Sequence, residues 1–308
     1  MAPGFALALA VPAALALAQD EAARPWEQWQ PPAVEMPDPN AFEPYELAWV
    51  LRAEIAADAG AEDDSGFGRA EELTLDELSE LCGQYEPVFR LLEEANAGEA
   101  QYPPLTDPAQ QMPYFAQIRE AARMFAARSV LRREQGRPLE AALDAIACMH
   151  LSADASTQGT LIAGLVSIAC EAIGMKQLEA TIPELDAPGA LAASNALRRA
   201  MVGRGTFADA IRGEETFARL AMKQYLPMFA GVGEAADEQI DPELAAQMRA
   251  MDPDATWQEL GEFYGAWIEQ AGKPWYARAE VMLPDNPLLA TVAPSLGVAG
   301  LKFAVADA

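Results

Sequence analysis

Glu171 is the residue whose position most needs a chemical explanation. It interrupts the run TLIAGLVSIACEAIGM, which as a helix is apolar around nearly its whole circumference. A carboxylate in such a helix must be paired with a cation or protonated, because an isolated buried charge is costly. We expect an internal salt bridge, with a functional acid or simple exposure as the alternatives. The candidate partners on neighbouring predicted helices are Arg119, Arg123 and Arg198.

His150 is the only histidine in the chain. It comes near the end of a predicted helix, where the carbonyl-rich terminus favours a cation, so a structural or capping role is expected. Catalysis by His150 would require a nucleophile or carboxylate partner that the sequence does not specify. A single histidine excludes a histidine-based metal site, and no C-x-x-C spacing points to zinc.

Other catalytic motifs are lacking. Glu214 and Glu215 are adjacent, and neighbouring residues on a helix do not share a face, so they are not an obvious acid/base pair. There is no glycine-rich phosphate loop, nucleophile elbow or H-E-x-x-H sequence. We therefore assign no catalytic residue, no metal ligand and no cofactor.

Aromatic residues gather late in the chain and form the one candidate groove. They lie at helical spacing, so packing against a core is the expected role. A groove for a sugar or a peptide, working with scattered carboxylates, is the alternative. The residues concerned are Trp257, Tyr264, Trp267, Trp275 and Tyr276.

Three cysteines are present, Cys82, Cys148 and Cys170. An odd number in an exported protein leaves at least one thiol unpaired or bonded to another chain. We expect free, buried thiols, because a cysteine in an alanine-rich helix usually acts as a small hydrophobic residue. A disulfide between Cys148 and Cys170, on consecutive predicted helices, is the alternative.

The composition indicates an acidic globular protein. The chain has 308 residues, 51% of them hydrophobic, which is enough for one large domain or two medium ones. The formal charge of −26 argues against a nucleic-acid partner or an anionic membrane, since both bind concentrated lysine and arginine.

The N-terminal residues predict export. Residues 5–18 form a short apolar run ending in Ala-Leu-Ala, whose small residues suit cleavage by signal peptidase before Gln19. We assign residues 1–18 to a signal peptide, with a retained alanine-rich helix as the alternative, and predict no membrane span in the mature chain. Residues 19–39 are rich in proline and predict an extended lead-in, which Trp26 and Trp29 would anchor.

Helical periodicity dominates the rest of the chain, and no alternating run of β-branched residues predicts a strand. We expect an all-α fold, a multi-helix bundle of orthogonal and antiparallel helices over residues 40–285. A helical tail at 286–308 follows, which is either docked on the body or the end of a fragment.

Three successive helices form the predicted centre of the bundle. Gly136 and Pro138 predict the turn between the first two, because glycine ends helices and proline starts them. The third is expected to be covered by neighbours on several sides. Pro87 predicts a bend or a break in an earlier helix. The three central helices are expected at 114–135, 139–152 and 160–182.

The central stretch resembles a known repeat. The sequence G-R-P-L-E-A-A-L-D-A-I, residues 136–146, resembles the turn into the second helix of a tetratricopeptide repeat and implies a TPR-like helix pair. The chain is also similar to a type of exported or membrane-anchored bacterial helical protein with no assigned function, which implies an all-helical body outside the cytoplasm. The second resemblance rests on P-N-A-F-x-x-Y, R-E-A-A-R-M-F, T-L-I-A-G-L-V-S-I-A and N-P-L-L-A-T-V-A-P-S-L, which begin at Pro39, Arg119, Thr160 and Asn286.

These features predict a non-catalytic exported protein that lies in the periplasm or outside the cell. We expect it to mediate protein–protein interaction or to form a structural part of an envelope assembly, with an unidentified protein as its partner. A carbohydrate- or peptide-binding or hydrolysing protein, using the late aromatic cluster and carboxylates, is the alternative.

Overall fold

The computed structural model describes residues 24–60, 66–107, 112, 114–156, 160–230 and 252–281, and within these ranges the chain is helical and has no strand. The prediction of an all-α fold is therefore confirmed. The predicted signal peptide and helical tail lie outside the described residues. The α-helices are α1 (Pro25–Gln28), α2 (Phe42–Asp58), α3 (Leu75–Gln84), α4 (Glu86–Ala95), α5 (Tyr114–Glu134), α6 (Pro138–Ser156), α7 (Leu161–Thr181), α8 (Ala187–Ala200), α9 (Phe207–Ala230) and α11 (Pro253–Ala271), with short 3-10 turns η1 (Phe67–Glu72), η2 (Ile182–Glu184) and η4 (Trp275–Ala277).

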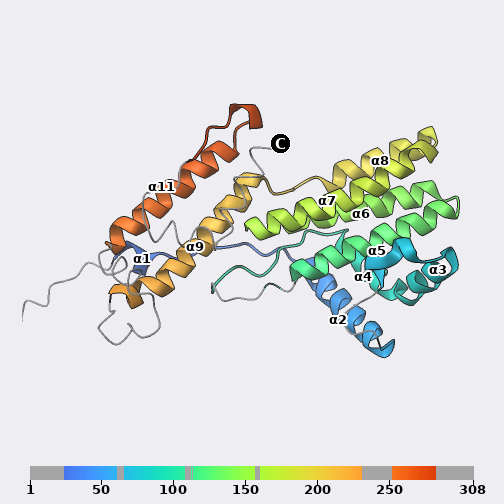
Figure 1. Ribbon diagram of the computed structural model, residues 1–308, viewed down its shortest axis with the longest axis horizontal. Coiled ribbons are helices and arrows are strands. Elements are labelled where there is room, and N and C mark those ends of the chain that lie inside the picture. Colours follow the sequence, from blue (N-terminus) through green and yellow to red (C-terminus); the bar gives the residue numbers. More distant parts are fainter. Residues whose placement is uncertain are drawn as a thin grey trace, which may run out of the picture.

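Helices α5, α6 and α7 lie side by side and form the centre of the larger lobe (Figure 1). The turn between α5 and α6 has the predicted form. Gly136 takes a left-handed φ of 72°, and the N–H of Arg137 donates to the Arg132 carbonyl at 2.9 Å, which closes the end of α5. Pro138 then begins α6, so the local prediction from glycine and proline is confirmed.

Helices α2, α3 and α4 cover the α5 side of this layer and share one buried cluster with α5 and α7. The predicted break at Pro87 is present, because the chain divides at Tyr85 into α3 and α4 with the proline in the first turn of α4. Thr74 and Glu77 form a capping box at the start of α3. Local chemistry therefore decides where these helices begin and end.

Helices α9 and α11 form a second lobe beside the end of α7, and α1 lies against both (Figure 1). This lobe has its own buried cluster, which includes Trp26 from α1. Trp29 meets Trp257 edge-on with ring centroids 5.6 Å apart, and Lys223 Nζ donates to the Trp29 carbonyl at 2.7 Å. The two tryptophans therefore anchor the lead-in, as expected, and they anchor it to the C-terminal lobe.

The most enclosed helix is α6, which lies between α5 and α7 and also contacts α8. Our expectation that α7 is covered on several sides was wrong. Four of its large residues, Ile162, Leu165, Ile168 and Met175, are exposed. An all-round apolar pattern shows only that a helix has apolar faces, and here one of those faces meets no neighbour in the described part of the chain.

Candidate functional site

Helix α7 packs against the bundle through its small residues. The inward face carries Ala163, Ser167, Cys170 and Gly174, all buried. A Cβ added at Gly174 would lie 2.6 Å from the carbonyl oxygen of Ala145, which shows how closely α7 approaches α6. The small residues therefore serve close helix packing.

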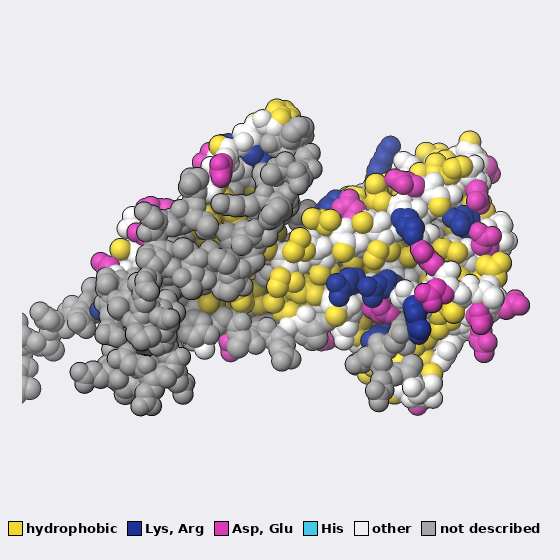
Figure 2. Space-filling view, in the orientation of Figure 1, with side chains coloured by type: hydrophobic (Ala, Val, Ile, Leu, Met, Phe, Trp, Pro, Cys, Tyr) yellow, Lys and Arg dark blue, Asp and Glu magenta, His cyan; other side chains and the backbone are white. Residues whose placement is uncertain are grey.

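The outward face of α7 carries four large apolar residues, whereas Leu161 and Leu178 near its two ends are buried. Ile162 is 54% exposed, Leu165 62%, Ile168 57% and Met175 43%. Figure 2 shows hydrophobic side chains gathered in a band over this helix, with lysine and arginine side chains along one edge. This arrangement reverses the usual one, in which a helix buries its large apolar residues and exposes its small or polar ones.

By length and composition alone, Leu161–Glu184 is the one stretch in the described ranges that could cross a membrane. Its mean hydropathy reaches 1.5, and 39% of the most apolar window is buried inside the fold. The core helix of a soluble protein satisfies the same criterion, so the stretch is weak evidence of a span.

The N-terminus of α7 is held by a buried carboxylate. Glu214 from α9 accepts a 3.1 Å hydrogen bond from the Leu161 N–H, and the Thr160 hydroxyl accepts one from Ala163. Burial raises the pKa of Glu214 to about 7, against the opposing effect of the Leu161 N–H. Glu215 instead bonds to Arg219 at 2.8 Å, so the two adjacent glutamates point apart, as predicted.

Glu171 has an arginine partner, but not one of those predicted. Its carboxylate pairs with the guanidinium of Arg204, which lies in the segment between α8 and α9, through two hydrogen bonds. Both side chains keep nearly a third of their surface exposed, so the pair is half-buried. Helix periodicity cannot place a loop residue, and this is why Arg204 was missed.

The predicted arginines lie elsewhere. Arg119 and Arg123 are exposed on α5 beside α7, and their charges act on the thiol of Cys170. Arg123 pairs with Glu120 of its own helix at 3.3 Å. Arg198 is exposed on α8. None of the three pairs with Glu171.

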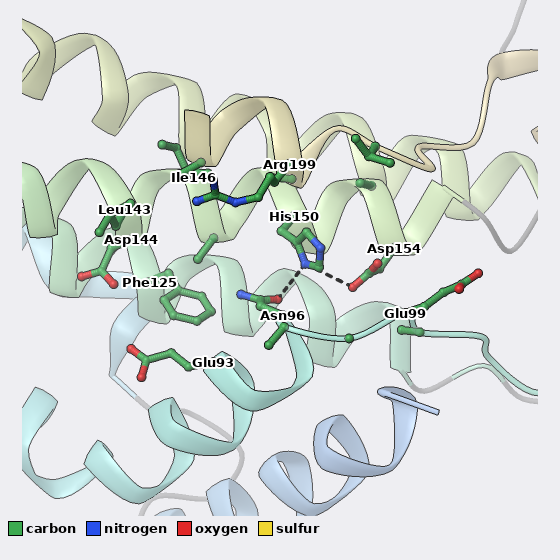
Figure 3. Close-up of a pocket in the computed structure, with 18 of the residues that line it drawn as sticks. Glu93, Asn96, Glu99, Phe125, Leu143, Asp144, Ile146, His150, Asp154 and Arg199 are labelled. Carbon is green, nitrogen blue, oxygen red and sulfur yellow. Dashed lines mark hydrogen bonds and ion pairs between the residues drawn. The ribbon is translucent and has the colours of Figure 1, made fainter. Parts of the chain in front are cut away.

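A cleft with a volume of about 930 Å³ runs along α6 (Figure 3). One wall comes from the end of α4 and the chain that follows it, and the other comes from α8. Leu143 and Ala147 give the middle of the floor an apolar surface, while charged and polar side chains occupy both ends. Periodicity did not predict this cleft, since its lining comes from four separate stretches of sequence.

One end of the cleft is a hydrogen-bonded polar group. Tyr45 Oη lies 2.6 Å from Asp154 Oδ2 and 2.8 Å from Asn96 Oδ1, and His150 Nδ1 lies 3.2 Å from the same Asn96 oxygen. Burial raises the pKa of Asp154 to about 7, with the Tyr45 hydrogen bond acting against it. Burial lowers the pKa of His150.

The predicted capping role for His150 was wrong. Helix α6 continues to Ser156, so His150 lies inside it and not at its carbonyl-rich end. Its polar contacts run to the side chains of Asn96 and Asp154, the latter at 3.6 Å. The residue therefore has a structural role through side-chain contacts, because the helix is longer than its periodicity predicted.

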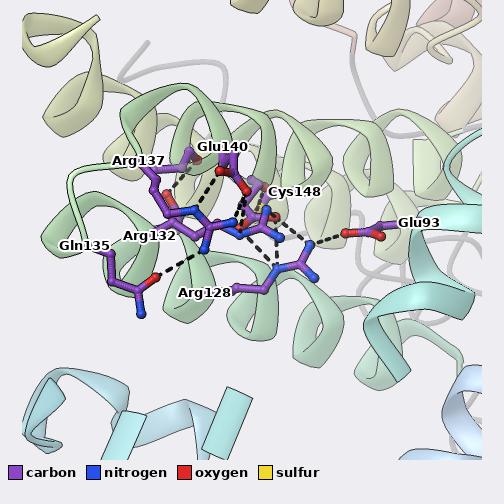
Figure 4. Close-up of polar contacts among 10 residues, drawn as sticks. Glu93, Arg128, Arg132, Gln135, Arg137, Glu140 and Cys148 are labelled. Atoms are coloured by element: carbon purple, nitrogen blue, oxygen red, sulfur yellow. Dashed lines mark hydrogen bonds and ion pairs between the residues drawn. The ribbon is translucent and has the colours of Figure 1, made fainter. Parts of the chain in front are cut away.

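The other end of the cleft is a buried charge cluster (Figure 4). Arg128 donates to both oxygens of Asp144 and to Glu93, and its guanidinium lies 4.0 Å from the ring centroid of Phe89. Arg132 adds a 2.9 Å ion pair to Asp144. Burial raises the pKa of Asp144, with both arginines opposing the shift. These charges are paired with one another, so the cluster is accounted for as a structural ion-pair network.

Trp257 and Tyr264 do not form the predicted aromatic groove. Trp257 and Tyr264 are buried in the core of the C-terminal lobe, where they pack with Trp26 and Phe263. Trp267 is half-buried against the same cluster. Core packing, the expected role, is therefore confirmed for Trp257 and Tyr264. The side chain of Trp275 lies outside the described part of the chain, and Tyr276 is exposed.

The three cysteines are free and buried, as expected. The alternative of a disulfide between Cys148 and Cys170 was wrong. Burial raises the pKa of Cys82 and of Cys170 to about 12, so these thiols stay protonated at neutral pH.

Comparison of the chain with protein-family models, with curated proteins and with solved structures found no match. The fold places the chain in the class of all-α proteins. Because a fold does not define a function, the function has to be argued from the sites themselves. Two features of the described residues are candidate binding sites: the exposed apolar face of α7 and the cleft along α6.

Proposed function

We propose that this chain is a non-catalytic exported helical protein that binds a protein partner through the outward face of α7. One observation carries the proposal: four large apolar residues of α7 face outward in one stripe, while the middle of its inward face is built from small residues. Leaving an aliphatic side chain in water forgoes roughly 1.5–3 kcal/mol relative to its full burial. Four such residues in one stripe are the kind of patch that marks an interaction site.

The fold itself does not require an apolar outward face. Helix α4, also at the surface of the bundle, carries Glu86 and Arg90 at outward positions, with side chains 48% and 75% exposed. Polar residues at the outward positions of α7 would leave its packing on α6 unchanged, since that packing uses the inward residues. The apolar stripe therefore serves something outside the described bundle.

Export is supported by the sequence at the N-terminus. The apolar run at 5–18 and its small residues have the composition of a cleavable signal peptide. The buried positions of Trp257 and Tyr264 weigh against the alternative of an aromatic-lined carbohydrate or peptide groove, so we do not propose it. The formal charge of −26 weighs against an anionic lipid surface as the occupant of the stripe.

The test is capture from an envelope fraction after mild cross-linking, using three forms of the full-length chain. These are the wild type, the double variant Leu165→Glu/Ile168→Glu, and the control Leu191→Glu. Leu191 is 64% exposed on α8, so the control changes an equally exposed leucine away from the stripe. Thermal melts followed by circular dichroism establish that all three forms fold.

We expect at least one partner that the wild type and the control capture and that the double variant loses. An identical set of captured proteins for all three forms would overturn the proposal. Flotation of the wild type with neutral lipid vesicles, lost in the double variant, would overturn it in favour of a lipid surface.

A further inference from the structure

The outward residues of α7 fall at the spacing of a helix-pairing seam. Leu165, Ile168, Ala172 and Met175 follow steps of three, four and three residues, and all four positions are exposed. This spacing matches the a and d positions of a heptad, which face a second helix. With Ile162 the stripe is about 21 Å long, enough for a partner helix of about four turns.

The two edges of this seam differ in charge. On the α5 side lie Arg119 and Arg123, exposed and one turn apart, close enough to α7 for both charges to act on Cys170. On the other side Glu171 is already paired with Arg204. Further along the α5 side, Lys176 of α7 pairs with Glu71, so the excess positive charge of this edge comes from Arg119 and Arg123. The other edge is internally neutralised.

The basic edge is largely available to a partner. Arg123 pairs with Glu120, three residues earlier on the same helix, and 45% of the Arg123 side chain stays exposed. An exposed ion pair of this kind restrains the Arg123 guanidinium only weakly. Within the described residues Arg119 has no ion pair. In a chain with 47 acidic and 21 basic residues, two adjacent arginines beside an apolar stripe form a distinct local field.

Resting on the proposed function, we infer that α7 binds an amphipathic helix of a partner protein that carries acidic residues along the flank facing Arg119 and Arg123. The apolar face of that helix covers Leu165, Ile168 and Met175. Ala172, the small residue in the seam, leaves room for a large partner side chain at the centre. Interfacial charge pairs of this kind fix orientation and partner choice, as the e and g positions do in coiled coils.

A second copy of this chain fits the seam less well. A two-fold antiparallel pairing of α7 with itself keeps each basic edge on the same side, so Arg119 and Arg123 would face their own counterparts. A parallel pairing would set them opposite the Glu171–Arg204 pair, which is already satisfied. The formal charge of −26 on each copy adds repulsion. The charge pattern therefore favours a different, acidic helix.

The test uses two designed helical peptides of about three heptads with leucine at every a and d position. One carries glutamate along a single flank and the other carries lysine at the same positions. Binding to the full-length chain is measured by fluorescence anisotropy at low and moderate salt. The variants are Arg119→Glu/Arg123→Glu, the stripe variant Leu165→Glu/Ile168→Glu, and Arg198→Glu/Arg199→Glu on α8 as a charge-matched control.

We expect the wild type to prefer the glutamate peptide by about tenfold or more, with the preference weakening as salt rises. Arg119→Glu/Arg123→Glu should reverse the preference toward the lysine peptide, and the α8 control should leave it unchanged. The stripe variant should bind neither peptide.

Each contrary result has a separate meaning. If the wild type bound both peptides equally and the stripe variant bound neither, the acidic-helix inference would be overturned. The apolar face of α7 would then remain the binding surface. Binding that survives in the stripe variant would overturn the inference and count against the proposed function. A wild-type dimer in analytical ultracentrifugation that the stripe variant dissociates would overturn the inference in favour of a second copy.

Discussion

The hydroxyl of Tyr45 on α2 lies 2.6 Å from Asp154 Oδ2 near the end of α6, and both side chains are buried. The same hydroxyl lies 2.8 Å from Asn96 Oδ1, yet a phenol has a single hydrogen to donate. The phenol therefore donates to one of these two oxygens at a time. Burial raises the pKa of Asp154 to about 7, against the opposing effect of the Tyr45 hydrogen bond.

This carboxyl makes the stability of the protein depend on pH. Between the ordinary pKa of 3.8 and the folded pKa of about 7, the folded chain holds a proton that the unfolded chain releases. The free energy of unfolding therefore falls as pH rises through this window, by up to about 1.4 kcal/mol per pH unit. The Asp154→Asn variant lacks this term, so it should gain stability relative to the wild type by about 1–3 kcal/mol between about pH 5 and pH 8.

Urea unfolding of both forms at each pH measures the difference. Burial lowers the pKa of His150, which acts in the opposite sense below about pH 6.5. Because His150 lies 3.6 Å from Asp154, the two forms are compared most directly above that pH. Glu214→Gln should give a separate gain of the same sign, since the pKa of Glu214 is also raised to about 7. Parallel pH profiles for wild type and Asp154→Asn would show that Asp154 is ionised in the folded chain throughout this range.

The close approach of α6 and α7 predicts a second effect. Gly174→Ala places a methyl group 2.6 Å from the Ala145 carbonyl and 2.9 Å from Cys148 Cβ, and neither atom belongs to the end of a flexible side chain. We expect a loss of about 1–3 kcal/mol, the usual cost of overpacking. Gly265→Ala on α11 is the matched control, because nothing lies within 4 Å of its added Cβ.

The Gly265→Ala control should raise the free energy of unfolding by about 0.5–1 kcal/mol, since alanine is more favourable than glycine inside a helix. Thermal or urea unfolding of the two variants beside the wild type measures both changes. A neutral or stabilising Gly174→Ala would mean that α6 and α7 separate easily, in conflict with the small-residue contact described for α7.

The charge cluster in the cleft predicts a third effect. Arg128→Leu removes the guanidinium that donates to both Asp144 oxygens and leaves that carboxylate buried with Arg132 alone. Breaking a buried pair from one side costs up to about 3–5 kcal/mol, and the remaining Arg132 pair should keep the loss of stability near the lower end of that range. The double variant Arg128→Leu/Asp144→Leu should recover much of this loss.

The comparison is a double-mutant cycle followed by urea unfolding. Arg90→Leu is the control, because its pair with Glu86 is exposed and 3.5 Å long and should matter little. A small effect of Arg128→Leu, close to that of the control, would place the cluster in water rather than in the protein interior.

Short-range features of the fold followed from the sequence alone. The break at Pro87 and the turn at Gly136 each depend on residues within one helical turn, and each lies where it was predicted. The all-α class followed in the same way, since periodicity and the absence of strand patterns are local signals. Buried, free cysteines followed from the composition of their helices.

Tertiary structure decided which residues pair and which helix faces are exposed, because contacts between distant segments leave no local signal in the sequence. The sequence predicted a salt bridge for Glu171, but only the fold brought the loop residue Arg204 to it. The sequence showed that α7 is apolar nearly all round, but only packing determined that Ile162, Leu165, Ile168 and Met175 face outward. Periodicity counts apolar positions on a helix, whereas the arrangement of neighbouring helices decides which of those positions remain open for a partner.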